Sequence, residues 1–188
     1  PEVLAMGLSE LLVNGVEHGN LGIDFAEKSR LREEDRWEEE IARRLALDNF
    51  IAFAPDALTP LGGYPGDEDK ARDAFAKLDQ AKTREDFLAA AQVLRQRPEC
   101  TGKYGSVGFC YGGGMVHFLS TRLPDMAAGV PFYGNHPPAD DAAKVKAPLL
   151  IHFAGVDERI NAAWPAYEAA LKAAGARYTA HQYPGTQH

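Results

Sequence analysis

The sequence predicts an α/β fold in which a mostly parallel sheet carries helices on both faces. Short apolar runs recur from about residue 38 onward, and amphipathic helical segments separate them. Cys110 stands between glycines where one such run passes into a helix. Acidic and histidine candidates follow later runs directly, as functional groups do at the carboxyl ends of parallel strands.

Composition indicates one soluble domain over residues 1–188. Hydrophobic residues make up 45% of the chain and charged residues 25%, which is ordinary for a globular protein. The net charge of −7 offers no basis for binding nucleic acid or an anionic membrane surface, and no apolar run is long enough for a transmembrane helix. Oligomeric state stays open.

The first half of the chain predicts a helix, a strand and then two further helices. Residues 38–47 place Ile41 and Leu45 on one helical face, and the apolar run 50–54 suits a buried strand. A Gly- and Pro-rich loop over 58–69 follows. Helices are expected over 67–80 and 84–96, with Thr83 as the N-cap of the second. Residues 1–37 give no firm element.

The second half alternates strand and helix more regularly. Strands are expected over 104–109, 127–133, 148–154 and 177–183. A helix should begin near Tyr111, and another should cover 164–174 with Gly175 as its C-cap. Because the strands are separated by helices, they should run parallel.

Residues 105–114 read Gly-Ser-Val-Gly-Phe-Cys-Tyr-Gly-Gly-Gly, a strand-to-helix turn with a nucleophile at its tip. Glycines at 108 and 112 let strand and helix approach closely. The helix N-terminus favours a thiolate on Cys110. We expect the backbone N–H of Tyr111 to be one oxyanion donor, with a second donor from an earlier loop that the sequence does not identify.

Asp157 and His188 are candidates to complete a catalytic triad with Cys110, in the order nucleophile, acid, histidine. Asp157 would orient the imidazole and stabilise its protonated form. Other readings stay open: Asp157 as a capping residue with Glu158 in the acid role, and His188 as a mobile chain end. Cys100 is interpreted as structural.

The other histidines do not predict a metal site, because none has the paired spacing of zinc motifs. His117 in a helix and His152 in a strand are expected to have structural roles with their hydrogen bonds satisfied. Tyr64 and Tyr133 are candidate substrate-binding residues from their loop and strand-end positions, although aromatic side chains there more often serve packing.

These residues resemble the dienelactone hydrolase family over about residues 38–188. The resemblance rests on Gly-Phe-Cys-Tyr-Gly-Gly-Gly at 108–114, Val-Asp-Glu-Arg-Ile at 156–160 and Tyr-Pro-Gly-Thr-Gln-His at 183–188. It implies an α/β-hydrolase fold and a triad of Cys110, Asp157 and His188. It also implies hydrolysis of a small ester or lactone through an acyl-thioester, without a cofactor or metal.

Two departures accompany this resemblance. The family usually carries a His-Glu-Asn-Arg-Gly-like loop before the helix at 38–47, but residues 29–37 do not match it, and Glu17 is only a weak candidate for its glutamate. The chain also stops at His188, where the family continues with Gly-Phe and a final helix. We therefore expect the biological protein to extend further.

Two rival functions remain. The chain could be a non-catalytic family member that acts as a binding or scaffold domain, as its divergent first 37 residues suggest. It could also sense oxidants through Cys110, with Cys100 as the resolving partner. Each use of Cys110 needs a reduced thiol, so we expect a cytoplasmic location.

Overall fold

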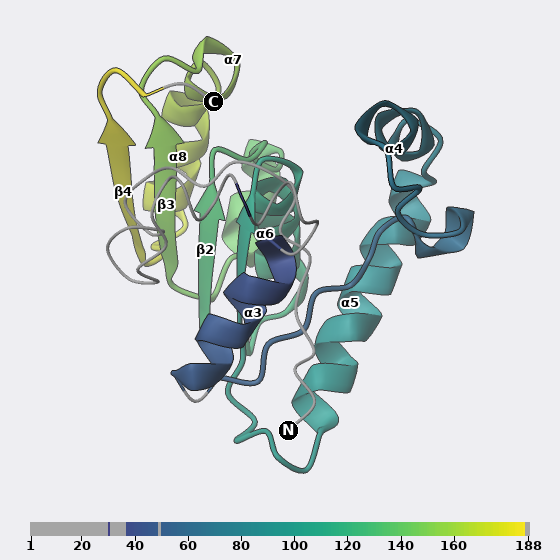
Figure 1. Ribbon diagram of the computed structural model, residues 1–188. Coiled ribbons are helices and arrows are strands. Elements are labelled where there is room, and N and C mark those ends of the chain that lie inside the picture. The colour runs from purple at the N-terminus through teal and green to yellow at the C-terminus, as the bar shows by residue number, and fades with distance from the viewer. Residues whose placement is uncertain (1–29, 31–36, 49, 187–188) are drawn as a thin grey trace.

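The computed structural model describes residues 30, 37–48 and 50–186 (Figure 1). Its centre is a four-stranded, all-parallel sheet in the order β1-β2-β3-β4. The strands are β1 (Gly105–Phe109), β2 (Ala128–Phe132), β3 (Leu149–Ala154) and β4 (Tyr178–Tyr183). The predicted α/β fold with a parallel sheet is confirmed.

Helices precede the sheet and connect its strands. They are α3 (Trp37–Leu47), α4 (Glu68–Phe75), α5 (Gln80–Gln96), α6 (Tyr111–Arg122), α7 (Glu158–Asn161) and α8 (Trp164–Ala173), with 3-10 turns η1 (Thr59–Leu61) and η2 (Ala139–Lys144). Because successive strands are neighbours and right-handed crossovers join them, α6 and α8 fall on the same face. Figure 1 shows them behind the sheet, with α3 in front of it.

Two apolar clusters hold these layers together. The first joins α5, α6 and Tyr104, the residue before β1, with Phe87, Met115 and Leu119 among its buried side chains. The second packs Ile151 and Phe153 of β3 against α8, where Leu171 is fully buried. Burying a large aliphatic or aromatic side chain contributes roughly 1.5–3 kcal/mol each. The first cluster therefore anchors α6, the helix that begins beside Cys110, against α5.

The structure corrects two expectations in the first half of the chain. Residues 50–54 have no regular secondary structure, and Phe50 is 63% exposed. An apolar run has side chains that suit a strand, but a strand also needs a neighbouring backbone to pair with. The apolar composition therefore predicted a strand that does not form here. The helix expected over 67–80 ends at Phe75, and the next begins at Gln80 because Asp79, rather than Thr83, caps it.

Candidate active site

Cys110 lies at the tip of a strained turn between β1 and α6. Its backbone has φ 50° and ψ −111°, a region that side-chain-bearing residues rarely adopt. The Cys110 N–H donates to the carbonyl oxygen of Phe132 at 3.1 Å, and the Cys110 carbonyl accepts from Gly114 at 3.1 Å. The neighbouring strand and the first helical turn thus hold the strained residue, and its side chain is half-buried.

Two positions near Cys110 must be glycine because a side chain there would clash with the neighbouring backbone. A Cβ atom on Gly108 would lie 2.3 Å from the carbonyl oxygen of Gly112, and one on Gly113 would lie 2.4 Å from that of Phe132. Both distances are shorter than any van der Waals contact. Only glycine lets the strand, the helix and β2 approach this closely, as the sequence pattern predicted.

The start of α6 provides the electrostatic part of the site. Cys110 is the N-cap residue, and the Tyr111 amide belongs to the first helical turn, whose N–H groups have no acceptor within the helix. The N-terminus of a twelve-residue helix favours negative charge beside it. These amides can therefore stabilise a thiolate or an oxyanion near Cys110.

The side chain of Tyr111 does not take part in stabilising negative charge near Cys110, and it contacts neighbouring helices instead. Its hydroxyl donates to Oε1 of Gln80 at 3.0 Å, and its ring packs edge to face with Phe75, 4.7 Å between centroids. Burial raises the pKa of the phenol. Tyr111 thus fastens the start of α6 to helices α4 and α5, a contact that the sequence pattern did not reveal.

Asp157 lies just beyond the carboxyl end of β3. It is 7% exposed and caps α7, with Oδ1 accepting from the Ile160 amide at 3.1 Å. The capping interpretation of Asp157 therefore holds, and a carboxylate has further lone pairs for a second partner. Strands β1 and β3 flank β2, so Cys110 and Asp157 follow the carboxyl ends of two strands that lie two strand spacings, about 10 Å, apart.

His188 lies outside the described residues, as do Glu17 and residues 29 and 31–36. The chain leading to His188 is described as far as Thr186. There it pairs with the Asp157 loop, because the Val156 N–H donates to the Thr186 carbonyl at 2.9 Å. Thr186 is a residue whose contribution the sequence did not single out.

The two tyrosines proposed as substrate-binding residues have different surroundings. Tyr133 follows β2 at φ 36° and is 2% exposed, with its ring near those of Phe109 and Phe132. Tyr64 is 43% exposed in the segment between η1 and α4. Tyr133 is thus packed in the interior next to the carboxyl end of β2, whereas Tyr64 is exposed to solvent.

His152 has the satisfied structural role that the sequence predicts, but His117 does not. His152 Nδ1 pairs with the Tyr183 hydroxyl at 2.8 Å, so this ring is satisfied. His117 is 1% exposed, and within the described part of the chain neither of its ring nitrogens has a hydrogen-bond partner. Burial lowers the pKa of His117 to about 3, with a smaller contribution from His136.

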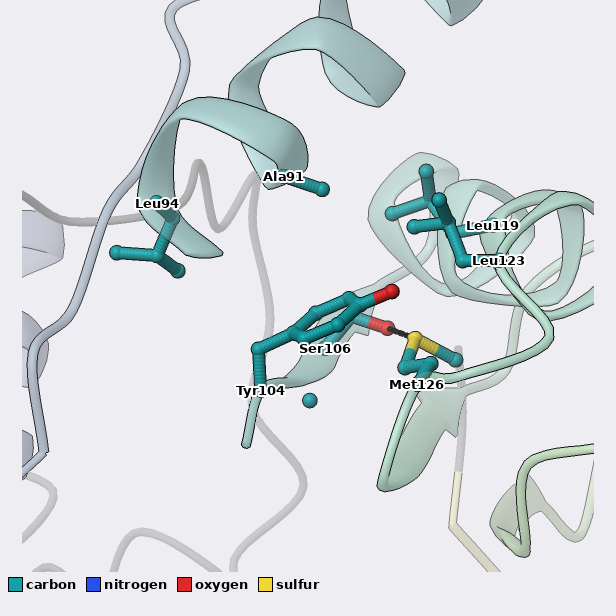
Figure 2. Close-up of a pocket in the computed structure, with 8 residues that line it drawn as sticks. Ala91, Leu94, Tyr104, Ser106, Leu119, Leu123 and Met126 are labelled. Carbon is teal, nitrogen blue, oxygen red and sulfur yellow. Dashed lines mark hydrogen bonds between the residues drawn. The ribbon is translucent and has the colours of Figure 1, made fainter. Parts of the chain in front are cut away.

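A shallow hollow lies elsewhere, between α5, β1 and α6 (Figure 2). Its lining is apolar, and within it Ser106 Oγ contacts Met126 Sδ at 3.3 Å. Tyr104 and Gly105 place it at the amino end of β1, so it lies away from Cys110. We do not assign it to the reaction.

The described ranges contain neither a candidate metal site nor a membrane-spanning helix. Residues 30, 37–48 and 50–186 contain no group of three or more His, Cys, Asp or Glu side chains that could bind a metal. Over the same ranges, no helix combines the length and apolar character needed to span a membrane.

Several known proteins have sequences similar to this one. A mouse carboxymethylenebutenolidase homolog is 40% identical over 119 residues, which are 62% of this chain and 48% of the mouse protein. A candidate carboxymethylenebutenolidase of Aquifex aeolicus is 30% identical over 129 residues, covering 65% and 55%. The chain thus spans about half the length of these curated relatives.

Comparison of structures agrees on the fold. A crystal structure of a candidate dienelactone hydrolase from Klebsiella pneumoniae superposes with a TM-score of 0.69 at 24% identity. The match covers 84% of this chain and 70% of that one. The family model described as "Dienelactone hydrolase family" matches residues 34–188, which include Cys110 and Asp157. This chain belongs to the dienelactone hydrolase family.

Proposed function

We propose that the protein hydrolyses a small carboxylic ester or lactone, with Cys110 as the nucleophile. The observation that carries this proposal is the backbone of Cys110, held at φ 50° on a glycine-lined turn at the start of α6. Strain of this kind costs roughly 1–3 kcal/mol and persists where it serves a function. The names of the relatives point to the same class of reaction.

The proposed reaction has two half-reactions. The Cys110 thiolate attacks the substrate carbonyl carbon, and the Tyr111 N–H stabilises the resulting oxyanion. The alkoxide leaves with a proton from the His188 imidazolium, so the acyl group remains on sulfur as a thioester. The neutral imidazole then takes a proton from water, the hydroxide attacks the thioester, and the carboxylic acid is released with the thiolate restored.

Asp157 is proposed to hold the histidine in the productive tautomer. Its position past β3, on the loop hydrogen-bonded to Thr186, supports a partnership with a residue that follows Thr186 closely. The reaction as written needs no cofactor, and its second oxyanion donor remains unassigned. A thiolate mechanism requires a reducing compartment such as the cytoplasm.

The test compares Cys110→Ser with Cys100→Ser, the same substitution at the other free cysteine. Both variants and the wild type are assayed on activated aryl esters and unsaturated lactones, before and after stoichiometric alkylation. We expect Cys110→Ser and alkylated wild type to lose at least 100-fold in kcat/KM, and Cys100→Ser to match the wild type. Full activity after complete modification of Cys110 would refute the assignment.

The same assay decides between the rival functions. A folded wild type that turns over none of these substrates would favour a binding or scaffold role. The redox alternative draws no support from the fold, because Cys100 precedes the amino end of β1 and Cys110 follows its carboxyl end. The two ends of this five-residue strand are about 13 Å apart, whereas a disulfide needs Cα atoms within about 7 Å.

A further inference from the structure

The last described residues of the chain are fastened to the loop that precedes Asp157. The Gly155 N–H donates to the Tyr183 carbonyl at 3.0 Å and to Oγ1 of Thr186 at 3.1 Å. The Val156 N–H donates to the Thr186 carbonyl at 2.9 Å. The hydroxyl of Thr186 in turn donates to the Tyr183 carbonyl at 2.7 Å. One threonine therefore contacts both residues that lead into Asp157.

The same loop is held from its other side. Asn161 Nδ2 donates to the Ala154 carbonyl at 2.8 Å. The approach between the two strand ends is also tight, because a Cβ atom on Gly155 would lie 2.4 Å from the Tyr183 carbonyl oxygen. The backbone before Asp157 thus has little freedom to shift, provided that Thr186 keeps its bonds.

We propose that Thr186 is a positioning residue that sets the orientation of Asp157 for the reaction, an inference that rests on the function proposed above. Its hydroxyl uses both of its capacities, accepting from Gly155 and donating to Tyr183. Valine has the same shape and can do neither. Replacing the hydroxyl removes these two hydrogen bonds and loosens the Asp157 loop, and a displacement of about 1 Å in a catalytic group can lower a rate about 100-fold.

The matched control is Thr121 in α6. Its hydroxyl also donates at 2.7 Å to a carbonyl three residues earlier, that of Phe118, but it lies near the far end of the helix from Cys110. Thr186→Val, Thr186→Ser and Thr121→Val are compared with wild type in the full-length protein. Thermal unfolding is recorded for each, together with kcat, KM and the pH dependence of kcat/KM.

We expect Thr186→Val to lower kcat tenfold or more with KM within twofold. The alkaline limb of its pH profile should move to lower pH, because a displaced carboxylate stabilises imidazolium less. Thr186→Ser should restore both quantities, and Thr121→Val should match wild type. Should Thr186→Val fail to fold, Thr186→Ala takes its place beside Thr186→Ser.

The inference is overturned if Thr186→Val keeps the wild-type kcat and pH profile, or if Thr186→Ser loses as much as Thr186→Val. Failure of the proposed function is a separate result, since it is read in wild type from Cys110. An active wild type that is insensitive to Cys110 alkylation refutes the thiol mechanism. Alkylation-sensitive wild type with an unaffected Thr186→Val refutes only the role of Thr186.

Discussion

The imidazole rings of His117 and His136 lie edge to face, 5.3 Å between centroids, inside the layer that joins α6 to α8. Tyr167 of α8 packs against both rings, at 5.4 and 5.1 Å. In the described part of the chain, none of the ring nitrogens nor the Tyr167 hydroxyl has a hydrogen-bond partner. Both histidines are therefore held neutral, since protonation here would bury an unpaired charge.

This pair predicts a loss of stability in acid. Burial lowers the pKa of His117 to about 3 and that of His136 to about 4, against about 6.5 in the unfolded chain. The unfolded state therefore binds more protons, so stability is fully present above pH 6.5 and is lost as pH falls toward 4 and 3. Between pH 6.5 and pH 5, His117 alone accounts for about 2 kcal/mol.

Urea unfolding at pH 7.5 and pH 5.0 measures this effect. We expect His117→Phe to show a smaller pH dependence of the unfolding free energy than wild type. Identical pH dependence in wild type and His117→Phe would show that His117 takes up no proton on unfolding.

Neighbouring glycines of the Cys110 turn should respond oppositely to alanine. In Gly108→Ala the new Cβ meets the Gly112 carbonyl oxygen at 2.3 Å, so we expect a loss of about 3 kcal/mol or more. In Gly114→Ala the nearest atom is 3.6 Å away and the site is helical, so we expect a gain of about 0.5–1 kcal/mol. Denaturant midpoints decide between these signs. Equal midpoints for the two variants would contradict the close approach of strand and helix.

Asp157→Asn separates the charge of this side chain from its capping bond. Asparagine can still accept from the Ile160 amide, so the unfolding free energy should change by less than about 1 kcal/mol. It cannot stabilise an imidazolium, and we expect kcat to fall by about 100-fold or more. Asp79→Asn, at the exposed N-cap of α5, is the control. A wild-type kcat in Asp157→Asn would leave Asp157 with a structural role alone.

The sequence predicted the parts of this molecule that depend on neighbours along the chain. Gly108 and Gly112 predict the turn at Cys110, because a strand, a nucleophile and a helix follow each other within a few residues. Asp157 could be placed at the same edge because parallel strands end together. The regular alternation of apolar runs and helical segments after residue 104 predicted the strands and helices of the second half of the chain.

What the sequence missed depends on contacts between distant segments. The hydroxyl of Thr186 finds its partner 31 residues earlier, at Gly155, and no local pattern reports such a bond. The apolar residues at 50–54 predict a strand only if another backbone pairs with them. The sequence offers Thr83 as an N-cap, but Asp79, a stronger capping residue, lies one turn earlier and caps the helix.

In the proposed reaction, an acyl group rests on the sulfur of Cys110 during turnover. Rapid acid quench of wild type with an activated aryl ester, followed by peptide mass analysis, tests it directly. We expect the mass of the substrate's acyl group on the peptide that contains Cys110, and none on the peptide that contains Cys100. Steady turnover with an unmodified Cys110 peptide at every quench time, or with the acyl group on another residue, would contradict the account.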